Sequence, residues 1–232
     1  MTTILITGAN KGLGFESARQ LVAAGHTIYL GSRDLERGQA AARAIGARPV
    51  QIDVTNDASV QPAVDTIAAD GGLDVLVNNA GIAPEWRADG IVGTADVTAD
   101  LMAETFETNV FGTVRVLHAF LPLLLRSAAP VVVNVSSRLA SLAVVSSADV
   151  AYPGVAYPAS KAAVNMLTVQ YAKAFPQIRI NSVEPGFTST DLNRGEGRQT
   201  VEQGAEIIVR MAQLGPDGPT GTYVEATGPL PW

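Results

Sequence analysis

The chain has 232 residues, carries a formal net charge of −6 and contains no cysteine. The acidic balance and the lack of a basic run argue against binding to nucleic acid or to an anionic membrane. The absence of cysteine excludes disulfides and thiolate metal sites and favours a cytoplasmic protein with no metal. We expect no signal peptide, because the N-terminus lacks a basic start and a long apolar stretch. We also expect no membrane span, because the strongly apolar stretch Ala119–Leu125 is far too short to cross a bilayer.

Short apolar runs alternate with amphipathic stretches along the chain. The expected strands are Ile4–Thr7, Thr27–Leu30, Pro49–Ile52, Val75–Val77, Val131–Val135, Ile178–Val183 and Thr222–Glu225. The expected helices are Leu13–Ala24, Leu35–Ile45, Ala58–Ala68, Met102–Asn109, Val110–Arg126, Pro158–Ala174 and Val201–Leu214. This alternation predicts βαβ units with right-handed crossovers. We therefore expect one α/β domain over residues 1–232, a Rossmann-like, doubly wound parallel sheet of about seven strands with helices on both faces.

A glycine-rich turn, Thr7–Gly14, joins the first predicted strand to the first predicted helix. Gly8 allows a sharp turn, Gly12 allows close approach to a pyrophosphate, and Gly14 allows tight helix–strand packing. A glycine turn alone also fits a site without a ligand, but its place between a strand and a helix favours a dinucleotide. The residues assigned to the cofactor here are Gly8, Asn10, Lys11, Gly12, Leu13 and Gly14.

The end of the second strand indicates which dinucleotide binds. Ser32 and Arg33 stand where an NAD site has a carboxylate for the ribose hydroxyls. Lys11 can reach the same region, and two cations favour a ribose 2′-phosphate, hence NADP(H). The alternative is that Lys11 and Arg33 are solvated surface charges. Asp34 is interpreted as the N-cap of the next helix.

Two further strand ends carry polar residues. Asp53 either accepts a hydrogen bond from the adenine amino group, with Val54 on the ring, or caps the next helix together with Thr55. The segment Asn78–Gly81 follows the fourth strand, where its small residues let the chain pass the cofactor and its asparagines tie neighbouring strand ends together. The residues of this segment assigned to the cofactor are Asn79, Ala80 and Gly81.

Tyr157 and Lys161 lie four residues apart at the start of a predicted helix, so both side chains share one face. A nearby ammonium lowers the pKa of a phenol from ~10, so that the tyrosine can exchange a proton with a carbonyl or alcohol oxygen. Ser137 can bond the same oxygen, although strand alternation does not decide between it and Ser136. Asn109 could interrupt a helix and hold a water beside Lys161. A surface tyrosine with a salt-bridging lysine would show the same spacing.

Together these motifs resemble the short-chain dehydrogenase/reductase family over essentially the whole chain. The resemblance implies that Asn109, Ser137, Tyr157 and Lys161 are the catalytic residues, and that Tyr157 and Lys161 also contact the cofactor. It further implies a nicotinamide loop after the sixth strand. The residues of that loop assigned to the cofactor are Pro185, Gly186, Thr188 and Thr190.

Within this family, the chain is most similar to the carbonyl reductases. The resemblance implies reversible hydride transfer from NADPH to a small ketone or aldehyde. The alternative is a non-catalytic NADP(H) sensor, which has no need of a proton donor. Trp86, Leu139–Val145, Phe187 and Leu192 either line an apolar pocket or anchor loops. Because Pro158–Ala174 is apolar on more than one face, we expect a homodimer or tetramer.

Overall fold

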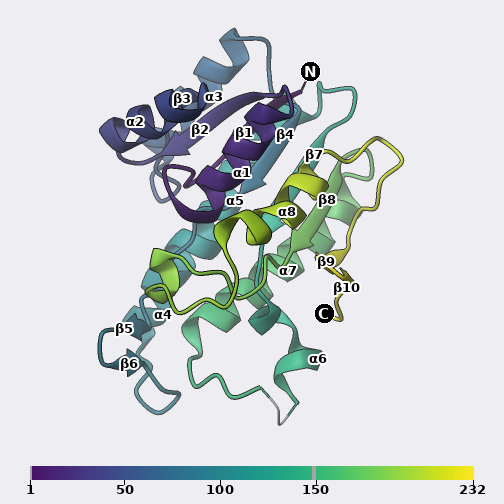
Figure 1. Cartoon of the computed structure of the whole chain (residues 1–232). Helices are drawn as coiled ribbons and strands as arrows, with labels where there is room; N and C mark the ends of the chain where they lie inside the picture. Colours follow the sequence, from purple (N-terminus) through teal and green to yellow (C-terminus); the bar gives the residue numbers. More distant parts are fainter. Residues whose placement is uncertain (1, 148–149) are drawn as a thin grey trace.

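The computed structural model describes residues 2–147 and 150–232 and centres on one eight-stranded sheet (Figure 1). The strand order is β10-β9-β8-β7-β4-β1-β2-β3, and every neighbouring pair is parallel except β9 and β10. The strands are β1 Thr3–Ile6, β2 Thr27–Ser32, β3 Arg48–Gln51, β4 Val75–Asn78, β7 Val131–Val135, β8 Arg179–Val183, β9 Tyr223–Glu225 and β10 Gly228–Pro229. All seven expected strands are present, which confirms the doubly wound sheet. The chain reverses its strand order between β1 and β4, where such sheets bind ligands.

Three short strands lay outside the sequence prediction. The antiparallel strand β10 extends the sheet edge, and β5 (Trp86–Arg87) pairs with β6 (Gly90–Ile91) in a separate hairpin. Each of these strands has only two residues, so none shows a period in the sequence. In Figure 1 the hairpin and helix α6 (Leu142–Val145) lie beyond the same end of the sheet.

Helices cover both faces of the sheet, as predicted. The main helices are α1 Gly12–Ala23, α2 Leu35–Ile45, α3 Asp57–Ala69, α4 Ala99–Phe106, α5 Gly112–Leu124, α7 Ala156–Ala174 and α8 Val201–Ala212. Alternate residues of β1 show the two layers, because Leu5 packs with α3 and α5 whereas Ile4 and Ile6 pack with α1 and α8. The predicted N-cap of α2 is confirmed, since the Asp34 side chain accepts from the Arg37 backbone N–H at 3.0 Å. None of the described helices combines the length and apolarity that crossing a membrane requires.

A chain of buried polar side chains links β4, β7, α7 and β8. Asn78 Nδ2 donates to Asn134 Oδ1 at 2.9 Å, and Asn134 Nδ2 donates to Thr168 Oγ1 at 2.8 Å. Thr168 and Ser182 hydroxyls are 2.8 Å apart. These bonds hold the helix that carries Tyr157 and Lys161 against the central strands.

Candidate functional site

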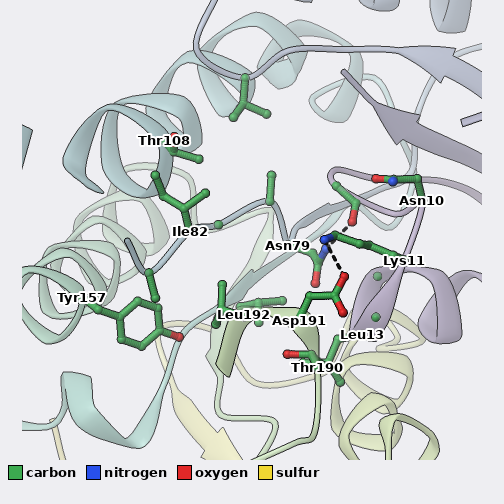
Figure 2. A pocket seen from close by; sticks show the side chains of 18 of the residues that line it. Asn10, Lys11, Leu13, Asn79, Ile82, Thr108, Tyr157, Thr190, Asp191 and Leu192 are labelled. Carbon is green, nitrogen blue, oxygen red and sulfur yellow. Dashed lines mark hydrogen bonds and ion pairs between the residues drawn. The ribbon is translucent and has the colours of Figure 1, made fainter. Parts of the chain in front are cut away.

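A cavity of about 730 Å³ runs along the carboxyl ends of the strands. It brings together loops that follow β1, β2, β3, β4, β7 and β8 with the first turns of α7. Figure 2 shows Tyr157 on one side of this cavity and the Lys11–Asp191 pair on the other, with Leu192 between them. The predicted site residues that line it are Gly8, Asn10, Lys11, Gly12, Leu13, Gly14, Arg33, Asp53, Val54, Asn79, Ala80, Gly81, Tyr157, Lys161, Pro185 and Thr190. Ser32, Asn109, Ser137, Gly186 and Thr188 are not part of the lining.

The glycine-rich turn leaves main chain exposed toward the cavity. Gly8 and Gly12 have φ values of +63° and +57°, which side chains other than glycine rarely adopt. A Cβ on Gly14 would lie 2.8 Å from the Gly8 carbonyl oxygen, so no larger residue fits there. Among the described residues, the Lys11 side chain does not cap α1, so the first N–H groups of this helix are left for a ligand.

The rim at the end of β2 carries one of the two predicted cations. Arg33 is exposed and lines the cavity. Ser32 is 2% exposed, and its hydroxyl donates to the Asp34 carbonyl at 2.8 Å, so this side chain faces the main chain. Lys11 Nζ lies 2.7 Å from Asp191 Oδ2, across the cavity. The ammonium of Lys11 is therefore paired with the Asp191 carboxylate in this structure.

The alternative role of Asp53 as a helix cap is wrong. Helix α3 is capped by Asn56, whose Oδ1 accepts from the Ala58 backbone N–H at 3.0 Å. Asp53 Oδ1 instead accepts from the backbone N–H and the hydroxyl of Thr55, at 3.0 and 2.8 Å. These bonds orient the Asp53 carboxylate in the cavity wall.

Asn79 ties the ends of β1 and β4 together, as predicted. Its Nδ2 donates to the carbonyls of Thr7 and Gly8 at 2.8 and 3.1 Å. In return, the Thr7 hydroxyl oxygen accepts from the backbone N–H groups of Asn79 and Ala80, both at 3.1 Å. The two loops therefore form one wall of the cavity.

Tyr157 and Lys161 project from α7 into the cavity. Lys161 Nζ lies 5.7 Å from the centre of the Tyr157 ring and donates to the Val135 carbonyl at 2.7 Å. Burial lowers the pKa of Lys161 to about 8 and raises the pKa of Tyr157 to about 12. The pKa of Tyr157 is therefore raised and not lowered as expected, because burial outweighs the hydrogen bond from Ser137, which acts in the opposite direction.

Ser137 lies beside the Tyr157 phenol. The Ser137 side chain hydrogen-bonds Tyr157, which lowers the phenol pKa against the larger effect of burial. Strand β7 ends at Val135, and Ser137 caps a 3₁₀ turn by accepting from the Leu139 backbone N–H at 3.3 Å. Ser136 is 1% exposed, lines the cavity, and its hydroxyl has no partner among the described residues.

Asn109 interrupts the helix, as predicted. It lies in a π-helical turn, Glu107–Phe111, between α4 and α5. Its Oδ1 accepts from the Ile82 backbone N–H at 2.8 Å, and its Nδ2 donates to the Ile82 carbonyl and to Ser160 Oγ at 2.9 and 3.0 Å. Asn109 therefore connects the loop after β4 with α7.

The loop after β8 contributes its two ends to the cavity. Pro185 and Thr190 line the cavity, whereas Thr188 is 4% exposed. The Thr188 hydroxyl donates to the carbonyls of Pro185 and Gly186 at 3.1 and 3.2 Å. Thr188 and Gly186 thus shape the loop from behind the cavity.

The sequence did not point to several residues that lie in the site or close to Tyr157. Asp191 follows Thr190 directly in the predicted nicotinamide loop, so its position in the sequence could have indicated that it lines the cavity. Glu85 and Glu184 are buried, with 0% and 7% exposure, and burial raises the pKa of Glu184. A glutamate in a predicted loop gives no sign of such burial. Of the proposed apolar residues, Trp86 and Leu192 line the cavity, whereas Phe187 and Leu139–Val145 do not.

The cavity fits a dinucleotide. Its volume suits a cofactor, the glycine turn offers main-chain N–H groups, and the buried Ser136 hydroxyl lacks a protein partner within the described ranges. Arg33 places a cation on the rim for a phosphate. Residues 2–147 and 150–232 hold no group of three histidine, aspartate or glutamate side chains that could bind a metal.

The model of the short chain dehydrogenase family matches residues 2–201. The chain is 34% identical to short-chain dehydrogenase/reductase 1 of Saponaria officinalis, over 94% of this chain and 92% of that protein. The structure of salutaridine reductase from Papaver somniferum superposes with a TM-score of 0.84 at 28% identity and covers 96% of this chain and 99% of that one. The carbonyl reductase Sniffer of D. melanogaster superposes with a TM-score of 0.85 at 26% identity, over 100% of both chains. The chain belongs to the short-chain dehydrogenase/reductase family of oxidoreductases.

Proposed function

We propose that this protein is an NADPH-dependent carbonyl reductase that converts a small ketone or aldehyde into the alcohol, with Tyr157 as the proton donor. The observation that carries the proposal is that Tyr157 and Lys161 open onto the same cavity as the glycine-rich turn. Cofactor binding and proton donation therefore share one space. Similarity to proteins named salutaridine reductase and carbonyl reductase supports this activity.

The residues around Tyr157 suit the reduction step. Bound NADPH supplies the hydride. Tyr157, with a pKa raised to about 12, holds its proton at neutral pH and can give it to the carbonyl oxygen. Ser137, which hydrogen-bonds the phenol, can donate to the same oxygen. Lys161, with a pKa of about 8, is mainly an ammonium at neutral pH and stabilises the phenolate that remains.

The remaining assigned residues bind and orient the cofactor in this proposal. The first turn of α1 takes the pyrophosphate, Asp53 and Val54 hold the adenine, and Arg33 and Lys11 take the 2′-phosphate. Asn109 positions α7 through its bond to Ser160.

Turnover of NADPH with a panel of ketones and aldehydes tests the activity, and Tyr157→Phe tests the proton donor. We expect this variant to lose about 100- to 10,000-fold in kcat, the usual contribution of a general acid, while NADPH still binds. Lys161→Ala should reduce both kcat and NADPH affinity. Near-normal turnover by Tyr157→Phe would refute the mechanism. Wild-type protein that binds NADPH but reduces no carbonyl would instead be a sensor.

A further inference from the structure

Glu85 is a fully buried carboxylate beside the proposed active site. It lies in the loop between β4 and β5 and is 0% exposed. Buried carboxylates are rare unless they are paired. No lysine or arginine within the described ranges forms an ion pair with Glu85. Hydrogen bonds must therefore compensate its burial.

One oxygen of Glu85 holds the start of α7. The N-cap residue of this helix, Val155, makes no side-chain cap bond. Glu85 Oε2 instead accepts from the Tyr157 backbone N–H at 3.0 Å. A carboxylate at a helix N-terminus also interacts favourably with the helix dipole. Glu85 thus takes the role of a cap for the helix turn that carries Tyr157.

The other oxygen of Glu85 holds the cavity wall. The Tyr152 hydroxyl donates to Glu85 Oε1 at 2.6 Å, and Trp86 Nε1 donates to the Tyr152 hydroxyl oxygen at 2.8 Å. Trp86 lines the same cavity as Tyr157. Its ring centre lies 6.3 Å from that of Tyr152 and 6.1 Å from that of Phe187, so three loops meet at this indole.

The segment around Gly154 packs directly on this carboxylate. A Cβ on Gly154 would lie 2.7 Å from Tyr152 Cε1 and 2.8 Å from the Glu85 carboxyl carbon. Thr94 also ties the hairpin region to this segment, because its hydroxyl donates to the Pro153 carbonyl at 2.9 Å. The hydrogen-bonded bridge from Trp86 through Tyr152 and Glu85 to Tyr157 therefore has little room to rearrange.

We propose that Glu85 is a positioning residue. It holds Trp86 through Tyr152 and holds the main chain of Tyr157 directly, so that the indole and the catalytic residue keep a fixed relative position. Trp86 then forms an apolar, aromatic wall that selects carbonyl compounds with a flat aryl group next to the carbonyl. The roles of Tyr157 and of this cavity rest on the proposed carbonyl reductase function.

Steady-state kinetics test the selective wall. Tyr152→Phe removes only the hydroxyl and leaves the Glu85–Tyr157 bond in place. We expect its KM for an aryl ketone such as acetophenone to rise roughly fivefold or more, the size expected for one lost hydrogen bond. Its kcat, and its KM for acetone, should stay within about twofold of wild type, whereas loss of folding would lower kcat for both ketones. Glu85→Gln should in addition lower kcat, since an amide has one accepting oxygen and cannot accept from both the Tyr152 hydroxyl and the Tyr157 N–H.

Fluorescence tests the bridge without any turnover. The chain has two tryptophans, so in a Trp232→Phe background the emission reports on Trp86. We expect Tyr152→Phe and Glu85→Gln to increase acrylamide quenching and to lower the anisotropy of this emission. Tyr171→Phe is the matched control, because Tyr171 stacks on Phe175 at the other end of α7 and should change neither.

The two experiments separate this inference from the proposed function. If wild type reduces no ketone but the quenching changes as expected, the bridge stands and the reductase function fails. If wild type is active but Tyr152→Phe behaves like Tyr171→Phe in KM and in quenching, the inference is overturned. Should Glu85→Gln fail to fold, Tyr152→Phe alone decides, because it keeps the buried carboxylate and its bond to Tyr157.

Discussion

Replacing Asp191 by asparagine should tighten the binding of NADPH. Lys11 Nζ lies 2.7 Å from Asp191 Oδ2, with side chains 61% and 77% exposed. Lys11 is one of the two cations proposed for the 2′-phosphate, so the carboxylate competes with the cofactor. Such an exposed pair contributes about 0–1 kcal/mol. Its removal should therefore strengthen NADPH binding by at most about fivefold, since 1.4 kcal/mol corresponds to about tenfold.

Arg33→Ala should have the opposite and larger effect. A hydrogen bond to a charged group contributes about 1.5–3 kcal/mol. Its loss should weaken NADPH by roughly one to two decades, and because Arg33 is exposed, salt should move the loss toward the lower value. NADH has no 2′-phosphate, so its affinity should change little.

The assay is a fluorescence titration of NADPH and NADH, together with kcat/KM for each cofactor, in wild type, Asp191→Asn and Arg33→Ala. Arg126→Ala is a suitable control, because Arg126 is exposed but does not line the cavity. Preference of wild type for NADH, or equal weakening of both cofactors by Arg33→Ala, would refute the 2′-phosphate site. Weaker NADPH binding by Asp191→Asn would show that the carboxylate does not compete with the phosphate for Lys11.

Three further predictions follow from burial and packing. The kcat/KM for reduction should fall above about pH 8, because Lys161, with a pKa lowered to about 8, loses its charge there; a pH profile that stays flat to about pH 10 would contradict this. Gly14→Ala should abolish NADPH binding, since its Cβ would lie 2.8 Å from a main-chain oxygen, whereas Gly215→Ala, with nothing within 4 Å, should bind normally in equilibrium dialysis. Exposed Met166 (59%) and Phe111 (51%) support a homodimer or tetramer, which light scattering should detect; a monomer at micromolar concentration would exclude it.

Local signals explain why most of the fold was predictable. Helix α2 begins and ends where the sequence predicts, because Asp34 supplies an N-cap and Gly46 adopts the left-handed conformation after the last turn. The break between the two predicted helices at Asn109 was likewise visible in the sequence, although its π-helical geometry was not. Strand β10 depends on pairing with β9 rather than on a pattern of its own.

Site residues could be predicted where their position after a strand brings them to the sheet edge. They could not be predicted where packing against distant segments determines the direction or the pKa of the side chain. Residues directly after strands, such as Asn79, reach the same sheet edge by topology. The direction of the Ser32 side chain and the raised pKa of Tyr157 depend on contacts from distant segments. The burial of Glu85 arises in the same way, since its partners lie 67 and 72 residues away.

The buried chain of polar side chains from Asn78 to Ser182 constrains how this sequence can evolve. Asn134 both accepts from Asn78 and donates to Thr168, so an apolar substitution there leaves the buried Asn78 Nδ2 group without this partner, whereas Thr168 keeps its bonds to Val164 and Ser182. Such a group costs about 1–3 kcal/mol, whereas replacing both members of a bonded pair can be nearly neutral. Single substitutions at these positions should therefore be selected against even where combined ones are accepted. Homologous sequences should accordingly change at these positions together, as a correlated set.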